Sequence, residues 1–149
     1  MKVSVRLAAL QDLEQLVPLF DGYRQFYGKP PDPALARRFL SDRLSRQDSL
    51  VLIAEEPRPA AVGFVQMYPS FSSVRAARIY ILNDLFVVAS ARRRGTGSLL
   101  LRSAAEHARA SGAVQLKLST EIKNVSAQRL YAALGWKRDE DFYEYALPL

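Results

Sequence analysis

The chain opens with a short alternation of polar and apolar residues and then changes to a helical spacing. Residues 2–7 alternate between the two kinds of side chain, a period of two that predicts a strand with one buried face. From Asp12 the apolar positions recur every three or four residues, which predicts a helix with the Asp12 carboxylate at its start. A Gly-Lys-Pro-Pro segment at 28–31 ends that helix. Asp32 followed by Pro33 then predicts the start of a second helix that runs to about residue 45.

The middle of the chain has the pattern of three consecutive strands. Apolar and β-branched residues dominate Leu50–Glu55, Ala61–Tyr68 and Arg78–Val88. The first two of these segments are separated by Glu56–Pro59, a stretch with two prolines that predicts a hairpin turn. We therefore expect three strands to follow the two N-terminal helices.

The third of these strands leads through an arginine- and glycine-rich loop into another helix. Apolar residues at helical spacing follow Gly97 and end at Gly112, and residues 113–119 alternate again as a strand. Strand, helix and strand in this order predict that the helix is a crossover between parallel strands. A short helix over Ser126–Leu134 and a closing strand over Phe142–Leu147 complete a mixed α/β layer structure.

Length and composition restrict the classes of protein that fit. The 149 residues are 49% hydrophobic, which suffices for one core but is short for two independent domains, so we expect a single domain over 1–149. The absence of cysteine excludes a disulfide scaffold, a cysteine nucleophile and a thiolate zinc site. The one histidine, His107, falls within a predicted helix, where a surface position is the simpler interpretation. We expect no metal site.

Charge and hydropathy indicate an anionic partner and no membrane. The chain carries 21 Lys and Arg against 15 Asp and Glu, a net charge of +6 that favours a nucleotide, a nucleic acid or a phosphorylated cofactor. The first residues do not have the apolar core of a signal peptide. No apolar run approaches the roughly 18 residues that cross a bilayer. We therefore expect a cytoplasmic protein.

The loop after the third of these strands has the features of a phosphate site. Gly95 and Gly97 let the backbone approach an anion without a Cβ in the way, and the following helix start presents N–H groups at the positive end of its dipole. Arg92, Arg93 and Arg94 add positive charge. An ordinary turn with solvated arginines is the alternative. The third glycine of a dinucleotide-binding loop and the Gly-Lys-Ser/Thr of a P-loop are both missing.

Two motifs give the chain a resemblance to a known family. Arg92-x-x-Gly95-x-Gly97, directly after the strand segment Leu82–Val87, is similar to the coenzyme-binding motif Gln/Arg-x-x-Gly-x-Gly/Ala of the GNAT N-acetyltransferases. The segment 124–136 resembles the family's Asn-x-x-Ala-x-x-Leu-Tyr-x-x-x-Gly-Phe, with Trp at its last position in place of Phe. Both motifs occur in the family's order. Together with the order of the predicted helices and strands, they extend the resemblance over essentially the whole chain.

The resemblance implies a GNAT fold, with a mixed central sheet of about six strands splayed between the fourth and fifth strands and four helices. Acetyl-CoA would lie in the opening between those two strands. Its pantetheine amides would pair with the backbone of Leu85, Phe86 and Val87. Asn124 would hydrogen-bond the coenzyme arm, and it also suits a helix N-cap. The pyrophosphate would lie on the loop formed by Arg92, Arg93, Arg94, Gly95, Thr96, Gly97 and Ser98.

Acyl transfer to an amine needs a proton for the departing thiolate and a base for the amine. The resemblance implies that Tyr131 donates that proton, and a core tyrosine is the alternative. Asp84 is the first candidate base, because a carboxylate inside an apolar strand is costly unless it is paired, hydrated or used. A structural pairing with a neighbouring arginine is its alternative. Glu121 is a second candidate, for which a solvated loop charge is the simpler interpretation. The N–H of Val87 would polarise the thioester carbonyl.

The acceptor side is expected at the first two helices and the loop between the strands 61–68 and 78–88, where aromatic residues gather. A resemblance to the branch of the family acting on polyamines, small amines and histone tails implies a primary-amine acceptor. Aromatic rings and carboxylates suit a cationic ligand. The aromatic residues are Tyr23, Phe26, Tyr27, Tyr68 and Phe71.

Two functions other than an acetyltransferase stay open. A basic nucleic-acid-binding or regulatory module would use the positive charge, but the sequence argues against it because no aromatic RNA-binding motif accompanies the arginines. A non-catalytic acyl-CoA sensor would keep the same fold without turnover. The open sheet edges and the apolar closing strand also lead us to expect a homodimer.

Overall fold

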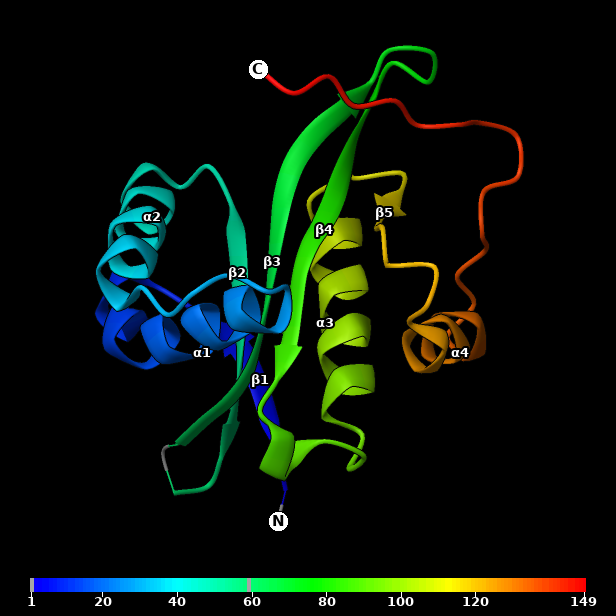
Figure 1. Cartoon of the computed structure of the whole chain (residues 1–149). Helices are drawn as coiled ribbons and strands as arrows, with labels where there is room; N and C mark the ends of the chain where they lie inside the picture. Colours follow the sequence, from blue (N-terminus) through cyan, green and yellow to red (C-terminus); the bar gives the residue numbers. More distant parts are fainter. Residues whose placement is uncertain (1, 59) are drawn as a thin grey trace. The chain divides into compact units, whose positions relative to one another are not determined.

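The computed structural model describes residues 2–58 and 60–149. The chain divides into two compact units, Met1–Ser119 and Thr120–Leu149, and each is described by itself. The larger unit contains a sheet with helices on both of its faces, and the smaller unit contains one helix and an extended C-terminal segment (Figure 1). Within the described ranges, no helix is both long enough and apolar enough to span a bilayer.

The larger unit is built on a five-stranded mixed sheet with the strand order β1-β2-β3-β4-β5. The first four strands pair antiparallel with their sequence neighbours, whereas β5 pairs parallel to β4. This parallel pair confirms that the helix between the two strands is a crossover. The strands are β1 Ser4–Leu7, β2 Leu50–Glu56, β3 Ala60–Ser72, β4 Ala77–Val87 and β5 Leu116–Lys117.

Two helices, α1 and α2, cover one face of the sheet, and α3 covers the other (Figure 1). Asp32 caps α2 as predicted, because its carboxylate accepts from the N–H of Leu35 at 3.0 Å and Pro33 occupies the first helical position. The helices of the larger unit are η1 Leu10–Asp12, α1 Leu13–Phe26, α2 Pro33–Arg46, η2 Ala89–Ala91 and α3 Thr96–Ala110, and the smaller unit contains α4 Val125–Ala133.

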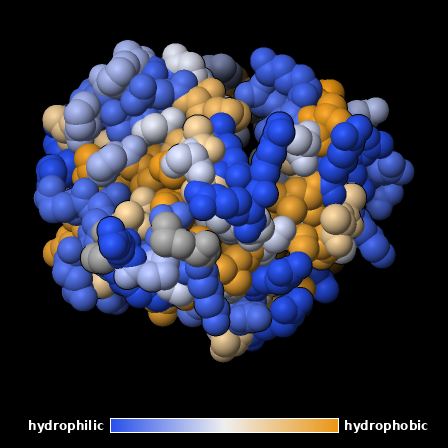
Figure 2. All heavy atoms as spheres, turned by 90° about the horizontal axis from the view of Figure 1, so that it is seen from below, coloured by the Kyte–Doolittle hydropathy of each residue, from blue (hydrophilic) through white to orange (hydrophobic). Residues whose placement is uncertain are grey.

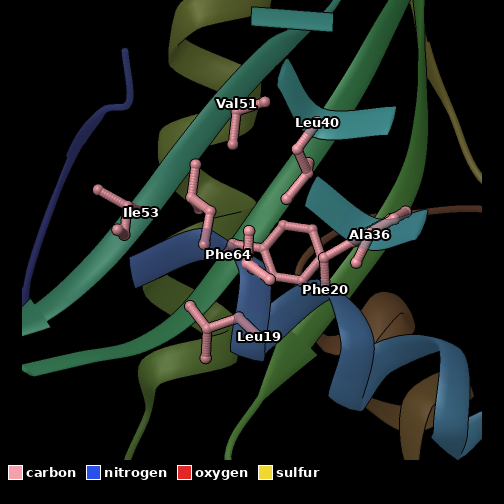
Figure 3. Packing of buried hydrophobic residues seen from close by; sticks show 9 residues of the cluster. Leu19, Phe20, Ala36, Leu40, Val51, Ile53 and Phe64 are labelled. Atoms are coloured by element: carbon pink, nitrogen blue, oxygen red, sulfur yellow. The ribbon is translucent and has the colours of Figure 1, made fainter. Parts of the chain in front are cut away.

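The principal core lies between the two N-terminal helices and strands β2 and β3 (Figure 3). The ring of Phe20 stacks on Phe39 with 5.4 Å between centroids and meets Phe64 edge-on at 6.2 Å. Each such side chain contributes about 1.5–3 kcal/mol by leaving water. The buried members of the cluster are Leu16, Val17, Leu19, Phe20, Ala36, Leu40, Val51, Ile53 and Phe64.

Gly63 in β3 lets α3 approach the sheet closely. A Cβ at this position would lie 2.8 Å from the main-chain oxygen of Phe86 and 3.2 Å from a methyl group of Leu100. The first of these neighbours is backbone of β4, which has little room to move. The absence of a side chain at Gly63 is therefore a packing requirement.

The predicted closing strand over Phe142–Leu147 is wrong. Residues 142–147 pair with no strand in the described part of the chain. Phe142 and Tyr143, which would face opposite sides of a strand, are 79% and 91% exposed. An alternating apolar segment becomes a strand only where a partner edge supplies hydrogen bonds and one face is buried. The described sheet therefore has five strands rather than about six.

Two other strands differ in length from the predictions. Of the segment predicted over 113–119, Leu116 and Lys117 form the strand β5, and Val114 and Gln115 each add a backbone hydrogen bond to β4. β3 continues past Tyr68 to Ser72 and includes Pro69. Its pairing with β2 ends at residue 67, and beyond it β4 is the one strand of the described residues that pairs with β3, an edge position that tolerates proline. The predicted turn over 56–59 includes Pro59, which lies outside the described residues.

Asp12 is the N-cap residue of α1, as predicted, but its carboxylate makes no capping hydrogen bond to that helix. Its carboxylate accepts hydrogen bonds from Arg6 at 2.8 and 3.0 Å and from the N–H of Ala9 at 2.8 Å. The Arg6 guanidinium also bonds Glu55. This guanidinium holds the pKa of the Asp12 carboxyl below its ordinary value of 3.8. The buried carboxylate therefore joins β1 to the start of α1.

Candidate active site

One edge of β4 is open over its C-terminal half. β5 pairs with Tyr80 and Ile81 and, in the part of the chain that the structure describes, with no later residue of β4. β4 itself continues to Val87. The parallel strands thus share a short ladder, beyond which the backbone of β4 has no strand on that side. The family resemblance implies a sheet splayed between the fourth and fifth strands, and this short ladder agrees with it.

Two amides of β4 point toward this open edge. The N–H of Val88 donates to the carbonyl of Val62 at 2.9 Å, which makes these two residues a hydrogen-bonded pair of the antiparallel ladder. Because such pairs alternate, Val87 and Leu85 occupy positions without hydrogen bonds to β3. Their N–H and C=O groups face away from β3. An extended ligand can add to such an edge as a further strand does.

A bulge at Asn83 interrupts the ladder just before these residues. Gln66 pairs with Asp84 and the next residue of β3 pairs with Leu82, so that Asn83 has no partner in register. Its carbonyl accepts a hydrogen bond from the hydroxyl of Tyr23 on α1 at 3.1 Å. The bulge therefore connects the strand with the open edge to the end of α1.

Asp84 is buried at 2% exposure within a polar network. Its two carboxylate oxygens accept from Nε2 of Gln66 at 2.6 Å and from Nδ2 of Asn83 at 2.7 Å, and Ser49 donates to Oε1 of Gln66 at 2.8 Å. Burial raises the pKa of the Asp84 carboxyl above its ordinary 3.8, while these donors and the Tyr23 hydroxyl act in the opposite direction. Its hydrogen-bond partners are two side-chain amides, not the arginine that the sequence offered as an alternative.

Two tyrosines next to Asp84 are held in their neutral form. Burial and the nearby Asp84 carboxylate raise the pKa of Tyr68 to about 12. The same two causes raise the pKa of Tyr23 strongly. Both phenols therefore keep their protons at neutral pH and can donate hydrogen bonds. The Tyr23 ring also meets the Tyr27 ring edge-on at 5.1 Å, so these predicted acceptor-side aromatics lie together.

The start of α3 leaves its backbone donors free of side-chain caps. Gly95 takes the left-handed conformation at φ 82° and is the N-cap residue, and no side chain of a described residue bonds the first-turn amides. The Thr96 side chain is buried and donates instead to the carbonyl of Ala91 at 3.4 Å. Gly97 and Ser98 follow in the first turn. Uncapped N–H groups at a helix start form a site for an anion.

The three arginines of the loop differ in what they contact. Arg92 donates from Nε to the carbonyl of Val87, and Arg94 bonds the carbonyl of Ser90 and pairs with Glu56 at 3.6 Å. Arg93 adopts φ 60° and its side chain has no partner among the described residues. The surface at this end of the molecule is mostly hydrophilic, with hydrophobic patches in between (Figure 2). From the sequence the three arginines had the same predicted role, whereas in the structure their side chains have different contacts.

The smaller unit holds the two remaining predicted site residues. Asn124 caps α4, because its side-chain oxygen accepts from the N–H of Ala127 at 3.3 Å. Tyr131 lies on the same helix, half-buried, with its ring centroid 6.0 Å from that of Trp136. Glu121 pairs with Lys123 at 3.4 Å and is exposed, as a solvated loop charge would be.

Sequence reasoning missed the supports of Asp84. Gln66 is fully buried inside an otherwise apolar strand, the same kind of interruption that singled out Asp84, and that signal could have found it. Asn83 and Ser49 carry no such signal, because their roles depend on the bulge and on the pairing of β2 with β3. Among residues 2–58 and 60–149, no three His, Cys, Asp or Glu side chains gather as a metal-binding group.

Comparisons with known proteins agree with this geometry. A family model described as "Acetyltransferase (GNAT) family" matches residues 13–136. The chain is 45% identical over 145 residues to the Bacillus subtilis (strain 168) protein "Uncharacterized N-acetyltransferase YhfO", covering 97% of each chain. It is 31% identical over 100 residues to "Aminoglycoside N(6')-acetyltransferase type 1" of Klebsiella aerogenes, covering 66% of this chain and 65% of that protein.

A solved structure described as "Crystal structure of a probable acetyltransferase" has a TM-score of 0.92 to this fold at 39% identity, covering 100% of this chain and 98% of that chain. The family model and the Bacillus relative both span most of the sequence, and this structural neighbour spans all of it. The chain therefore belongs to the GNAT family of acetyltransferases and is an acyltransferase.

Proposed function

We propose that this enzyme transfers an acetyl group from acetyl-CoA directly to a primary amine of a small molecule or a peptide. The observation that carries the proposal is the position of Asp84, a buried carboxylate directly before the open edge at Leu85 and Val87. One strand thus supplies a base and the amides that hold the donor. GNAT acetyltransferases use acetyl-CoA as the donor, so the direction of transfer follows from the family.

The donor binds along the open edge and at the start of α3. The pantetheine amides pair with the backbone of Leu85 and Val87, and the N–H of Val87 polarises the thioester carbonyl. Of the predicted set, Phe86 pairs with Phe64 and turns its backbone groups to β3. The pyrophosphate receives hydrogen bonds from the first-turn amides of α3, with the Arg93 side chain free to add a charge. The residues of this phosphate loop are Arg92, Arg93, Arg94, Gly95, Thr96, Gly97 and Ser98.

Asp84 accepts the proton of the acceptor ammonium, directly or through water. A carboxylate with a raised pKa is a stronger base than an exposed one, which suits proton removal near neutral pH. After attack of the amine, the C–N bond forms and the C–S bond breaks, and Tyr131 donates its phenolic proton to the thiolate. Asn124 contributes to the coenzyme arm in addition to capping its helix.

The acceptor side is formed by the aromatic end of α1. The Tyr27 ring contacts those of Tyr23 and Phe26, and the Tyr23 hydroxyl bonds the Asn83 carbonyl beside Asp84. Faces of aromatic rings next to a carboxylate attract a cationic amine. Transfer to an amine is also what is named for the relative from Klebsiella aerogenes. A cationic primary amine is therefore the proposed acceptor class.

We further propose that the enzyme is a cytoplasmic homodimer. The support is the C-terminal segment, where large apolar side chains such as Tyr145 and Leu147 are 93% and 82% exposed. Apolar side chains in such a row typically pack against a partner. Light scattering after size-exclusion chromatography is expected to give twice the mass of 16.7 kDa, and a monomer would remove this part of the proposal.

The test of the proposed function is an acceptor screen with acetyl-CoA. Primary amines of increasing charge are incubated with the protein, and N-acetylated products are detected by their mass. We expect product with cationic primary amines and a loss of about 100-fold or more for Asp84→Asn and Tyr131→Phe. A protein that binds acetyl-CoA but acetylates no amine would be a sensor, and one that binds only nucleic acid would contradict the proposal.

A further inference from the structure

The side chain of Arg92 contacts two elements that the proposed reaction must bring together. Its Nε–H donates to the carbonyl of Val87 at 2.8 Å. Its guanidinium carbon lies 5.7 Å from the ring centroid of Phe86 and 6.0 Å from that of Phe26. Val87 and Phe86 end β4, whereas Phe26 is the last residue of α1. One side chain therefore contacts both the open-edged strand and the aromatic helix end.

A second contact between α1 and β4 lies one helical turn before Phe26. The ring of Phe86 packs so closely on Gly22 of α1 that a Cβ there would lie 3.2 Å from it. Gly22 is one helical turn before Phe26. The end of the helix is thus held to the strand by Phe86 at Gly22 and by the Tyr23–Asn83 hydrogen bond, and Arg92 adds a link at Phe26.

The chemistry of these contacts requires arginine. The guanidinium is planar and can place its face on aromatic rings while an N–H in its own plane donates a hydrogen bond. A lysine ammonium carries the same charge but has neither the plane nor the Nε–H. A phosphate ligand, in contrast, tolerates lysine as a point charge. The substitution Arg92→Lys therefore distinguishes a role in these aromatic and hydrogen-bond contacts from a role as a phosphate ligand.

We propose that the Arg92 side chain is a positioning residue that fixes the Val87 peptide and the end of α1 to each other, while its backbone opens the phosphate loop. The proposal rests on the proposed function, since Val87 binds the donor and the end of α1 faces the acceptor. The side chain acts on the reacting groups through these two elements. Arg93, with no partner among the described residues, is the side chain that meets the phosphates.

The test compares acetyl-CoA with acetyl-pantetheine, a donor that lacks the phosphates, in Arg92→Lys, Arg92→Ala and the matched control Arg93→Ala. We expect both Arg92 variants to lose about tenfold in kcat/KM with either donor, the size expected for one hydrogen bond to a charged group. The acceptor KM should rise as well, because Phe26 at the end of α1 loses its contact with Arg92. Arg93→Ala should lose more with acetyl-CoA than with acetyl-pantetheine.

Two results would overturn this role. Full activity of Arg92→Lys would show that charge alone matters, and a loss confined to acetyl-CoA would make the Arg92 side chain a phosphate ligand. A Phe26→Leu variant supplies a second check, since its effect on acceptor KM should be non-additive with that of Arg92→Lys. If Arg92→Ala does not fold, Arg92→Lys and Phe26→Leu still decide the question.

A measurement without turnover separates this inference from the proposed function. Hydrogen exchange of the free protein should show faster exchange at Phe26 and Tyr27 in Arg92→Lys than in the wild type, because Phe26 loses its contact with the Arg92 guanidinium. Unchanged exchange contradicts the positioning role even if the enzyme is active. If the wild type acetylates no amine, the proposed function fails while the exchange result still tests the contact.

Discussion

The side chain of Gln66 donates a 2.6 Å hydrogen bond to Oδ2 of Asp84 from a fully buried position. This donor stabilises the charged carboxylate, so its removal should raise the pKa of Asp84 further. We expect Gln66→Leu to move the rising limb of the pH–rate profile to higher pH by about one unit, the equivalent of one charged hydrogen bond. The other groups around the carboxylate, Tyr23 and Tyr68, stay neutral over this range.

Ser49→Ala is the matched control for that experiment. It removes only the hydrogen bond that orients the Gln66 amide and leaves the Gln66–Asp84 contact in place. Its pH profile should shift less than that of Gln66→Leu. If both variants keep the wild-type profile, Asp84 is not the group whose ionisation limits the rate.

Asp84 should make the folded protein less stable as the pH rises. A carboxyl whose folded pKa lies above its unfolded value favours folding at low pH and loses that contribution as pH rises through the folded pKa. Asp84→Asn removes this dependence. The unfolding free energy of Asp84→Asn should therefore increase relative to that of the wild type between pH 4 and pH 8. Urea unfolding at the two pH values measures it, and a constant difference would argue against a raised pKa.

Asp12 should have the opposite pH dependence. Its folded pKa is lowered, chiefly by the hydrogen bonds from Arg6, so its contribution is present above the ordinary value of 3.8 and is lost as pH falls through the folded pKa. Asp12→Asn should cost about 1–2 kcal/mol at pH 7, since the half-exposed Arg6 screens part of the attraction. Thermal unfolding should show this loss shrinking toward pH 3. The exposed pair of Glu14 with Arg37 is the control, and Glu14→Gln should have little effect at either pH.

Gly63→Ala should destabilise the protein through packing. The added Cβ would lie 2.8 Å from the Phe86 carbonyl, so either β3 or β4 must shift. We expect a loss of about 1–3 kcal/mol in unfolding free energy. Gly112→Ala, at a positive-φ position with open space around it, tests conformational strain without a clash. Equal stability of Gly63→Ala and the wild type would mean that the sheet accommodates the methyl group.

The sequence predicted the elements whose patterns are local. The Asp32 cap, the crossover helix and the antiparallel strands follow from spacing, caps and glycines within each segment. The closing strand at 142–147 failed because a strand depends on a partner edge that no local pattern supplies. Asp12 stands at the predicted helix start, but its carboxylate bonds Arg6 of β1, a partner that no local pattern identifies.

The candidate site was predicted in part. Asp84 was found because a carboxylate inside an apolar strand is recognisable from the sequence. The glycine loop was found because glycines directly before a helix indicate an anion site. The bulge at Asn83 was not visible, because register depends on the pairing of two strands. The different contacts of Arg92 and Arg93 were hidden for the same reason, since Phe26 lies far from them in the sequence.

The most direct test of the central claim is a product balance for acetyl transfer. The wild type and Asp84→Asn are each mixed with acetyl-CoA and a cationic primary amine, and N-acetylated amine, free CoA and the mass of the protein are measured together. The account predicts one acetylated amine per CoA released by the wild type, an unmodified protein, and a large loss of rate in Asp84→Asn that diminishes only at high pH, where the amine is already neutral. CoA release without acetylated amine, or undiminished transfer by Asp84→Asn, would contradict it.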